Sequence, residues 1–204
     1  MLAFYSERLN TTEINYTFRR NPSESTLANW SAQTPAQFRF TLKAPQLITH
    51  IRQLRGCESL VQHFADVAQT LGPKLGVILF QLPPSLEFDA PLLCEFLDSL
   101  PPKMKAAFEF RHESWFNEET FSALQSRNVA LCIADSEKLH TPVRVTADYA
   151  YFRLRDEGYT TTDIARWAIE IKKVSALLAD TYVYFKHEES GLGPKFAEML
   201  IKAF

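Results

Sequence analysis

The chain has 204 residues, of which 46% are hydrophobic and 23% charged, and its formal net charge is -2. This balance is typical of a globular protein, and such a small net charge gives no overall electrostatic reason for binding nucleic acid or a membrane. The three cysteines are far apart and form no CxxC pair, which argues against a disulfide framework or a zinc ribbon. Free thiols of this kind fit a reducing cytoplasm, so we expect a cytoplasmic protein. No apolar run is long enough to span a bilayer, and we expect no membrane binding.

Strand-type and helix-type segments alternate along the whole chain. After an opening helix at 1–9, strands are predicted at 10–16, 38–43, 76–82, 106–111, 129–135, 150–155 and 181–186. Helices are predicted at 25–33, 58–72, 90–100, 118–127, 162–179 and 193–204, with Ser23, Asn117 and Thr162 as start signals. This order predicts a parallel sheet with helical crossovers, and the lack of a linker indicates one domain over residues 1–204.

The pattern within the strands favours a barrel over an open sheet. In FRFTLK, at 38–43, the two phenylalanines and the leucine share one face, and the arginine, threonine and lysine share the other. Strands of an open doubly wound sheet would be almost continuously apolar, because helices cover both faces. We therefore predict an α/β TIM-like (β/α) barrel with seven visible strands, lacking the first of the usual eight.

Charged and amide side chains follow the predicted strands to their C-terminal ends, where barrel enzymes place their catalytic groups. In FEFRHESWF, alternation puts Glu109 and Arg111 on one face of a strand that otherwise looks buried. Buried charge is costly unless it is paired or in use. We predict Glu109, Glu13 and Asp135 as catalytic acid/base residues. The predicted substrate-binding residues are Arg111, Arg153, Lys43, Asn15, Gln81, Trp115 and Lys186.

Other interpretations of these residues remain open. The charges could form a salt-bridge network that only closes the barrel mouth. A magnesium or manganese site from Glu13, Glu109, Asp135, His187 and Glu188 is the weaker idea, and we predict no metal, because nearby Lys and Arg oppose another cation. The glycines before Pro194 could bind phosphate at a helix start, and His50 or His112 could transfer protons.

Several long segments of the chain resemble the YecE-like family, domain of unknown function 72. They are residues 13–50, 71–86, FEFRHESWF, TADYAYFRLR and TYVYFKHEE, which occur in the family's order. The resemblance implies a TIM-like barrel but no particular reaction. It implies motif positions at Glu13, Asn15, Thr17, Lys43, Gln81, Glu109, Arg111, Trp115, Asp135 and Arg153.

Two departures from the family pattern affect the functional prediction. The Gly- and Trp-containing first strand is absent, and Arg155-Asp156 stands where the family often has His-Gly. We predict an enzyme acting on a small anionic substrate, a sugar phosphate or sugar acid, although the enzymatic role and any cofactor stay open. The alternatives are nucleic-acid processing, or a non-catalytic, shortened relative acting as a binding protein. Open edges on the strands at 10–16 and 181–186 would favour self-association.

Overall fold

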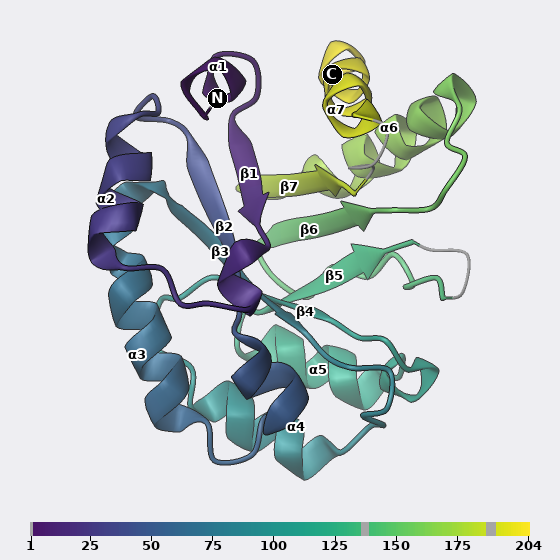
Figure 1. The fold of residues 1–204 in the computed structure, drawn as a ribbon. Helices are drawn as coiled ribbons and strands as arrows, with labels where there is room; N and C mark the ends of the chain where they lie inside the picture. Colours follow the sequence, from purple (N-terminus) through teal and green to yellow (C-terminus); the bar gives the residue numbers. More distant parts are fainter. Residues whose placement is uncertain (1, 136–138, 187–190) are drawn as a thin grey trace.

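The computed structural model describes residues 2–135, 139–186 and 191–204. All seven predicted strands form one parallel sheet, in which they follow each other in chain order (Figure 1). The strands are β1 (Thr11–Ile14), β2 (Arg39–Lys43), β3 (Leu75–Gln81), β4 (Ala106–Glu109), β5 (Ala130–Ala134), β6 (Tyr149–Leu154) and β7 (Asp180–Phe185). Several are shorter than predicted, so Arg111 lies just beyond β4.

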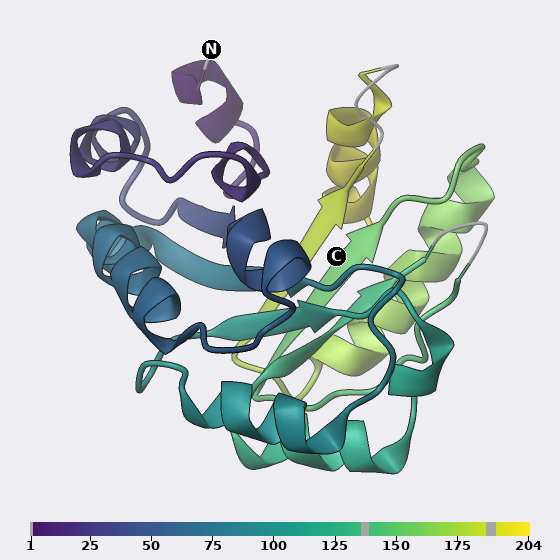
Figure 2. The same cartoon turned by 60° about the horizontal axis from the view of Figure 1, so that its bottom comes forward.

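Helices cover the outside of the curved sheet, as Figure 2 shows from a second direction. The α-helices are α1 (Leu2–Ser6), α2 (Glu24–Ala32), α3 (Glu58–Ala68), α4 (Ala90–Asp98), α5 (Glu118–Ser126), α6 (Thr161–Ser175) and α7 (Leu192–Lys202). Short 3-10 turns occur at η1 (Tyr16–Phe18), η3 (Gln69–Lys74) and η4 (Glu113–Trp115), and η2 (Leu47–Ile51) is a π-helical turn. None of the helices in these ranges combines the length and apolarity that crossing a membrane requires; the cytoplasmic location stays a prediction.

Two of the predicted helix starts are confirmed and one is wrong. Ser23 Oγ accepts the amide of Thr26, and Asn117 Oδ1 accepts the amide of Thr120. The cap of α6 is Thr160, not Thr162, because Thr160 Oγ1 accepts the Asp163 amide while the Asp163 side chain accepts the Thr160 amide. This reciprocal pair is a capping box, which satisfies two amides that the first helical turn leaves without partners.

The two faces of each strand enter different environments, which explains the alternation in the sequence. Phe80, Phe108 and Phe110 point outward into the apolar layer between the sheet and the helices. The opposite face lines the barrel interior, where Leu79 and Ala107 pack among tyrosines of β6 and β7. The outward phenylalanines therefore direct Glu109, which lies between two of them, into the interior.

The ends of the sheet, β1 and β7, meet through side chains. The hydroxyl of Tyr184 on β7 makes hydrogen bonds of 2.8 Å to Thr11 Oγ1 and to Thr41 Oγ1. Within the described ranges, β1 pairs along its backbone with β2 and β7 pairs with β6, but they do not pair with each other. The fold is therefore a nearly closed TIM-like barrel of seven strands, as predicted.

Candidate functional site

Arg153, near the C-terminal end of β6, is the centre of an ion-pair network inside the barrel. Its Nη1 donates to Glu109 Oε2 at 2.7 Å, and its Nε and Nη2 both donate to Glu13, the shorter distance being 2.8 Å. Nη2 also reaches Asn15 Oδ1 at 3.2 Å. All three nitrogens of this 2%-exposed side chain are thus engaged, so Arg153 connects β1, β4 and β6 across the interior.

Glu109 is fully buried and surrounded by donors. Besides Arg153, it accepts a 2.8 Å hydrogen bond from Gln81 Nε2 and pairs with Arg111, whose Nε lies 2.5 Å from Glu109 Oε1. Burial by itself would raise the pKa of Glu109, but the charges of Arg153 and Arg111, with the hydrogen bond from Gln81, lower this pKa to about 2. The two charged side chains in question in FEFRHESWF, Glu109 and Arg111, therefore pair with each other, and Glu109 also pairs with Arg153.

Glu13 is held in a similar way from β1. Its carboxylate accepts a 2.7 Å hydrogen bond from the hydroxyl of Tyr151 in addition to the bonds from Arg153. Burial raises the pKa of Glu13, whereas the charge and hydrogen bonds of Arg153 lower it further than burial raises it. Both glutamates are consequently ionised at neutral pH and are weak bases.

Lys43 at the end of β2 has a different environment from the arginines. Its Nζ donates to Gln81 Oε1 at 2.8 Å and lies 4.1 Å from the centre of the Phe18 ring. The residue is 8% exposed. Burial lowers the pKa of Lys43, and the nearby charge of Arg153 lowers it further, to about 8. Thr17 donates to the Lys43 carbonyl at 2.6 Å and so fixes this strand end.

Arg111 and Arg155 form the outer part of the network. Their side chains are 27% and 28% exposed, and Arg155 Nη1 lies 3.7 Å from Glu109 Oε1, beyond hydrogen-bonding distance. In the part of the chain that the structure describes, the buried Nε of Arg111 makes no hydrogen bond and approaches Glu109 Oε1 only as an ion pair. A small pocket of about 10 Å³ lies between the two arginines. It has room for about one water molecule, so a larger ligand would require Arg111 or Arg155 to move.

His50 lies on the π-helical turn η2, which follows β2. Turns of this type are rare and frequently occur at functional sites. Its Nδ1 makes a 2.9 Å hydrogen bond with Thr49 Oγ1, and its ring packs edge-on against Phe18. Burial, followed by the charges of Lys43 and Arg111, lowers the pKa of His50. The imidazole is therefore neutral at neutral pH, in a position where it could exchange a proton.

Seven of the predicted site residues lie together at this end of the barrel: Glu13, Asn15, Lys43, Gln81, Glu109, Arg111 and Arg153. Asp135 lies beside them but is committed to the backbone, since it accepts the Arg155 amide at 2.8 Å and also bonds the hydroxyl of Tyr159. The catalytic and binding roles of these residues stay predictions.

The expectation for Trp115 was wrong. Its indole is 0% exposed, donates to the Leu86 carbonyl at 2.7 Å, and stacks on Phe110 with ring centres 4.7 Å apart. Phe110 faces the helices, so Trp115 belongs to the outer apolar layer and cannot cover a ligand at the barrel mouth.

Three residues at the mouth were missed or undervalued. Tyr151 shares the inward face of its strand with Arg153, and that alternation could have revealed it. Arg155 follows Arg153 on the same face by the same alternation and approaches Glu109, but it is not among the predicted site residues. His50 had no distinguishing signal, because neither a π-helical turn nor its neighbours are visible in the sequence.

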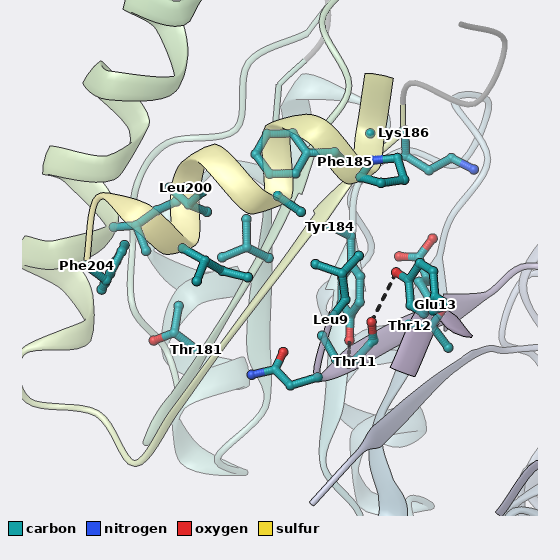
Figure 3. A pocket seen from close by; sticks show the side chains of 18 of the residues that line it. Leu9, Thr11, Thr12, Glu13, Thr181, Tyr184, Phe185, Lys186, Leu200 and Phe204 are labelled. Atoms are coloured by element: carbon teal, nitrogen blue, oxygen red, sulfur yellow. Dashed lines mark hydrogen bonds between the residues drawn. The ribbon is translucent and has the colours of Figure 1, made fainter. Parts of the chain in front are cut away.

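A separate, larger cavity of about 610 Å³ lies between β1 and β7, against α7 (Figure 3). Apolar side chains such as Leu9, Val183 and Leu200 form much of its lining, and Glu13 and Lys186 also line it. Predicted residue Lys186 therefore belongs to this cavity, which the ionic site meets at Glu13. The cavity occupies the position where the barrel is not closed by strand pairing.

The structure describes only some of the residues considered for a metal site and for a phosphate-binding loop. Over the described ranges, no group of three or more His, Cys, Asp and Glu residues is arranged to hold a metal ion. His187 and Glu188 lie outside the described residues. The predicted phosphate loop also lies partly outside them, and Gly193 and Pro194 in the first turn of α7 line the cavity between β1 and β7.

The parallel barrel and the charged site at the C-terminal ends of its strands define a TIM-like barrel protein. Comparison with protein families shows a match to "Protein of unknown function DUF72" over residues 1–204. The chain therefore belongs to the DUF72 family, which confirms the resemblance found in the sequence. No reaction follows from the family or from the fold.

Individual relatives agree with this assignment. The chain is 34% identical over 142 residues to UPF0759 protein YecE of Escherichia coli K12, a match that covers 67% of this chain and 52% of the relative. The chain thus spans about half the length of the curated relatives it matches. A crystal structure of a DUF72 family protein from Thermotoga maritima has a TM-score of 0.84 and 26% identity, covering 95% of this chain and 84% of that one. A DUF72 family protein from Enterococcus faecalis, with a TM-score of 0.87 at 20% identity over 99% of this chain and 92% of that one, shows the same fold.

Proposed function

We propose that the protein binds a small anionic molecule at the barrel mouth and acts on it as an enzyme. A sugar phosphate or sugar acid is the substrate class. The observation that carries this proposal is the local charge: Lys43, Arg111, Arg153 and Arg155 outnumber the carboxylates among them, Glu13, Glu109 and Asp135. An anion bound beside Arg111 and Arg155 would neutralise this excess of positive charge.

The pKa directions support a positive potential at the mouth. The charge of Arg153 lowers the pKa of Lys43, the charge of Arg111 lowers that of Arg155, and both Lys43 and Arg111 lower that of His50, in each case in addition to burial. Such like-charge repulsion is unfavourable in the free protein, and a bound phosphate or carboxylate would relieve it. The planar fork of a guanidinium suits either group.

We assign the residues of the site to two roles. Arg111 and Arg155, the partly exposed cations, would hold the anion, while Arg153, Glu13 and Glu109 would keep the strand ends in position. Proton transfer would fall to Lys43, whose lowered pKa of about 8 lies closer to neutral pH than that of an ordinary lysine, and to His50, whose lowered pKa leaves its imidazole uncharged and able to accept a proton. Transfer by Glu109 or Glu13, the earlier prediction, would require protonating a carboxylate held in ion pairs.

A thermal-shift screen tests the proposal. The ligands are inorganic phosphate, sugar phosphates, sugar acids, nucleotides and oligonucleotides, and the variants are Arg111→Ala and, as a matched control, Arg127→Ala, an exposed arginine paired with Asp98 far from the mouth. A ligand that binds the native state raises the melting temperature by mass action.

We expect one class of small anion to stabilise wild type and the Arg127 variant but not the Arg111 variant. Stabilisation that survives in Arg111→Ala, or no stabilisation by any anion, would contradict the proposal. Steeply salt-dependent stabilisation by oligonucleotides alone would favour nucleic-acid binding instead.

A further inference from the structure

We infer that Lys43 is a nucleophilic amine that captures the carbonyl group of an anionic aldehyde, ketone or oxo acid. This inference rests on the proposed function, because the anionic part of the ligand would be held by Arg111 and Arg155. It adds a covalent step and narrows the substrate class to molecules that carry both an anionic group and a carbonyl group.

The first argument is the set of partners around the amine. Lys43 is buried, yet within the described ranges no carboxylate lies within ion-pair distance of its Nζ. Its contacts are a neutral amide oxygen, Gln81 Oε1, and the ring of Phe18. Gln81 is in turn oriented by Glu109, which accepts its amide hydrogen at 2.8 Å. The site therefore positions the lysine without neutralising it.

The second argument is the electrostatic surrounding. The charged groups that act on Lys43 are Arg153 and Arg111, which disfavour its ammonium form, and Glu109 and Glu13, which favour it. His50 adds no charge near neutral pH, because its own pKa is lowered. Together with burial, these groups lower the pKa of Lys43 to about 8. Roughly half of the amine is then uncharged at that pH, compared with well under about 1% of an ordinary lysine. Desolvation next to other cations is a known way to activate an amine for carbonyl chemistry.

The third argument is position. Lys43 ends β2 on the catalytic side of the barrel, and its carbonyl is fixed by the 2.6 Å hydrogen bond from Thr17. The Phe18 ring, which lies on the short turn η1 and is only half-buried, covers the amine. His50 packs edge-on against the same ring, and the charge of Lys43 contributes to lowering its pKa, so the two groups interact electrostatically.

The proposed step needs no oxidant or reductant. The lone pair of the uncharged Lys43 amine attacks the carbonyl carbon, a C–N bond forms as the C–O π bond breaks, and one proton passes from the nitrogen to the oxygen to give a carbinolamine. Protonation of its hydroxyl group lets the remaining C–O bond break with loss of water, and the nitrogen loses its second proton as the C=N bond of the imine forms. One molecule of water is released, and we assign the transfer of protons between nitrogen and oxygen to His50, whose imidazole is uncharged near neutral pH.

The test uses pyridoxal 5'-phosphate, which combines an aldehyde with a phosphate, followed by reduction of any imine with sodium borohydride. Intact-mass measurement counts the attached groups, and peptide mapping of the wild-type protein locates them without relying on a variant. We expect Lys43 to be labelled at least tenfold faster than the exposed Lys172, with a rate that rises as the pH passes about 8. Pyridoxal without phosphate should label Lys43 at least tenfold more slowly.

Variants separate this inference from the proposed function. Lys43→Arg keeps the charge but cannot form an imine, so it should lose the fast labelling, and Arg111→Ala should slow it; Lys172→Arg is the matched control. Labelling of Lys43 no faster than of surface lysines, in a protein that phosphate still stabilises through Arg111, would overturn the inference and leave the anion site standing. If phosphate stabilisation is absent as well, the proposed function fails.

Discussion

At the scale of single residues, Arg153 and its two glutamates place three charged groups inside the barrel, away from water. Removing charges from water is costly, and the cost is offset only by close pairing with complete hydrogen bonding. The structure pairs the Arg153 guanidinium closely with Glu109 at 2.7 Å and with Glu13 at 2.8 Å, whereas Glu109 Oε1 and Arg111 Nε meet only as an ion pair and make no hydrogen bond. The network therefore contributes little net stability compared with an apolar core, but losing one partner leaves an unpaired buried charge.

Arg153→Ala should lower the free energy of unfolding by about 3–5 kcal/mol, because both glutamates would stay buried without a cation. Urea unfolding at pH 7 measures the change. Arg166→Ala is the matched control: Arg166 is 64% exposed and pairs with Asp163 one helical turn away, and such pairs are worth about 0–1 kcal/mol. Equal losses of unfolding free energy in the two variants would contradict the predicted cost of leaving two buried glutamates without a cation.

The lowered pKa of Glu109 predicts how stability depends on pH. The folded pKa of about 2 lies below the unfolded value of about 4.3, so the unfolded state binds the proton more readily in this interval. The stabilisation is fully present above about pH 5 and is lost as the pH falls toward 2. We expect a loss of about 3 kcal/mol from this group, as the difference of about two units implies. Glu109→Gln should make the free energy of unfolding, measured with urea, depend less on pH over this range. An unchanged pH dependence in the variant would contradict the lowered pKa of Glu109.

At the scale of elements, the start of α6 shows how a local motif can be misplaced by two residues. The sequence TTTD offers three candidate caps, and Thr162 directly precedes the acidic residue. A capping box requires the acidic partner three residues after the cap, which selects Thr160 with Asp163.

Thr160→Ala should therefore destabilise the protein by about 1 kcal/mol, the usual value for a lost helix cap. Thr162→Ala makes the same chemical change inside the exposed first turn and should be neutral or slightly stabilising, because alanine is the better helix former. Thermal or urea unfolding of the two variants, measured in parallel, tests which threonine caps α6. A larger effect at Thr162 would restore the assignment made from the sequence.

At the scale of the whole molecule, the distinctive feature is the interface between β1 and β7. The Lys186 amide donates to the Leu154 carbonyl, and in a parallel ladder the alternate residues, including Thr181, point their amides away from that neighbour. Edges of this kind can accept another strand, and the apolar cavity beside them would bury its side chains. Self-association through these edges remains a prediction.

We expect sedimentation measurements to show a mass that rises with protein concentration. Thr181→Pro should weaken this association at least tenfold, about 1.4 kcal/mol, because proline removes the amide donor. Thr181→Val keeps the donor and the strand propensity, so it should associate like wild type. A monomer at every concentration, or equal behaviour of the two variants, would contradict the prediction.

Local patterns along the chain predict its strands and helices. Period-two alternation and helix signals depend on residues a few positions apart, which is why all seven strands and the inward direction of Glu109 were predicted correctly. The strand-end rule then selected most of the residues that lie together at the mouth. The same rule misplaced Trp115, because side chains in the loop after a strand can turn toward either face.

Which charged side chains pair with one another is a property of the folded barrel. Arg153 and Glu13 are 140 residues apart, and their contact depends on how far the barrel closes. Closure also places Arg111 and Arg155 beside one carboxylate and leaves Lys43 with an amide as its partner. The pKa values of these groups follow from burial and from distances between strands, so no pattern along the chain could have distinguished the lysine from the arginines beside it.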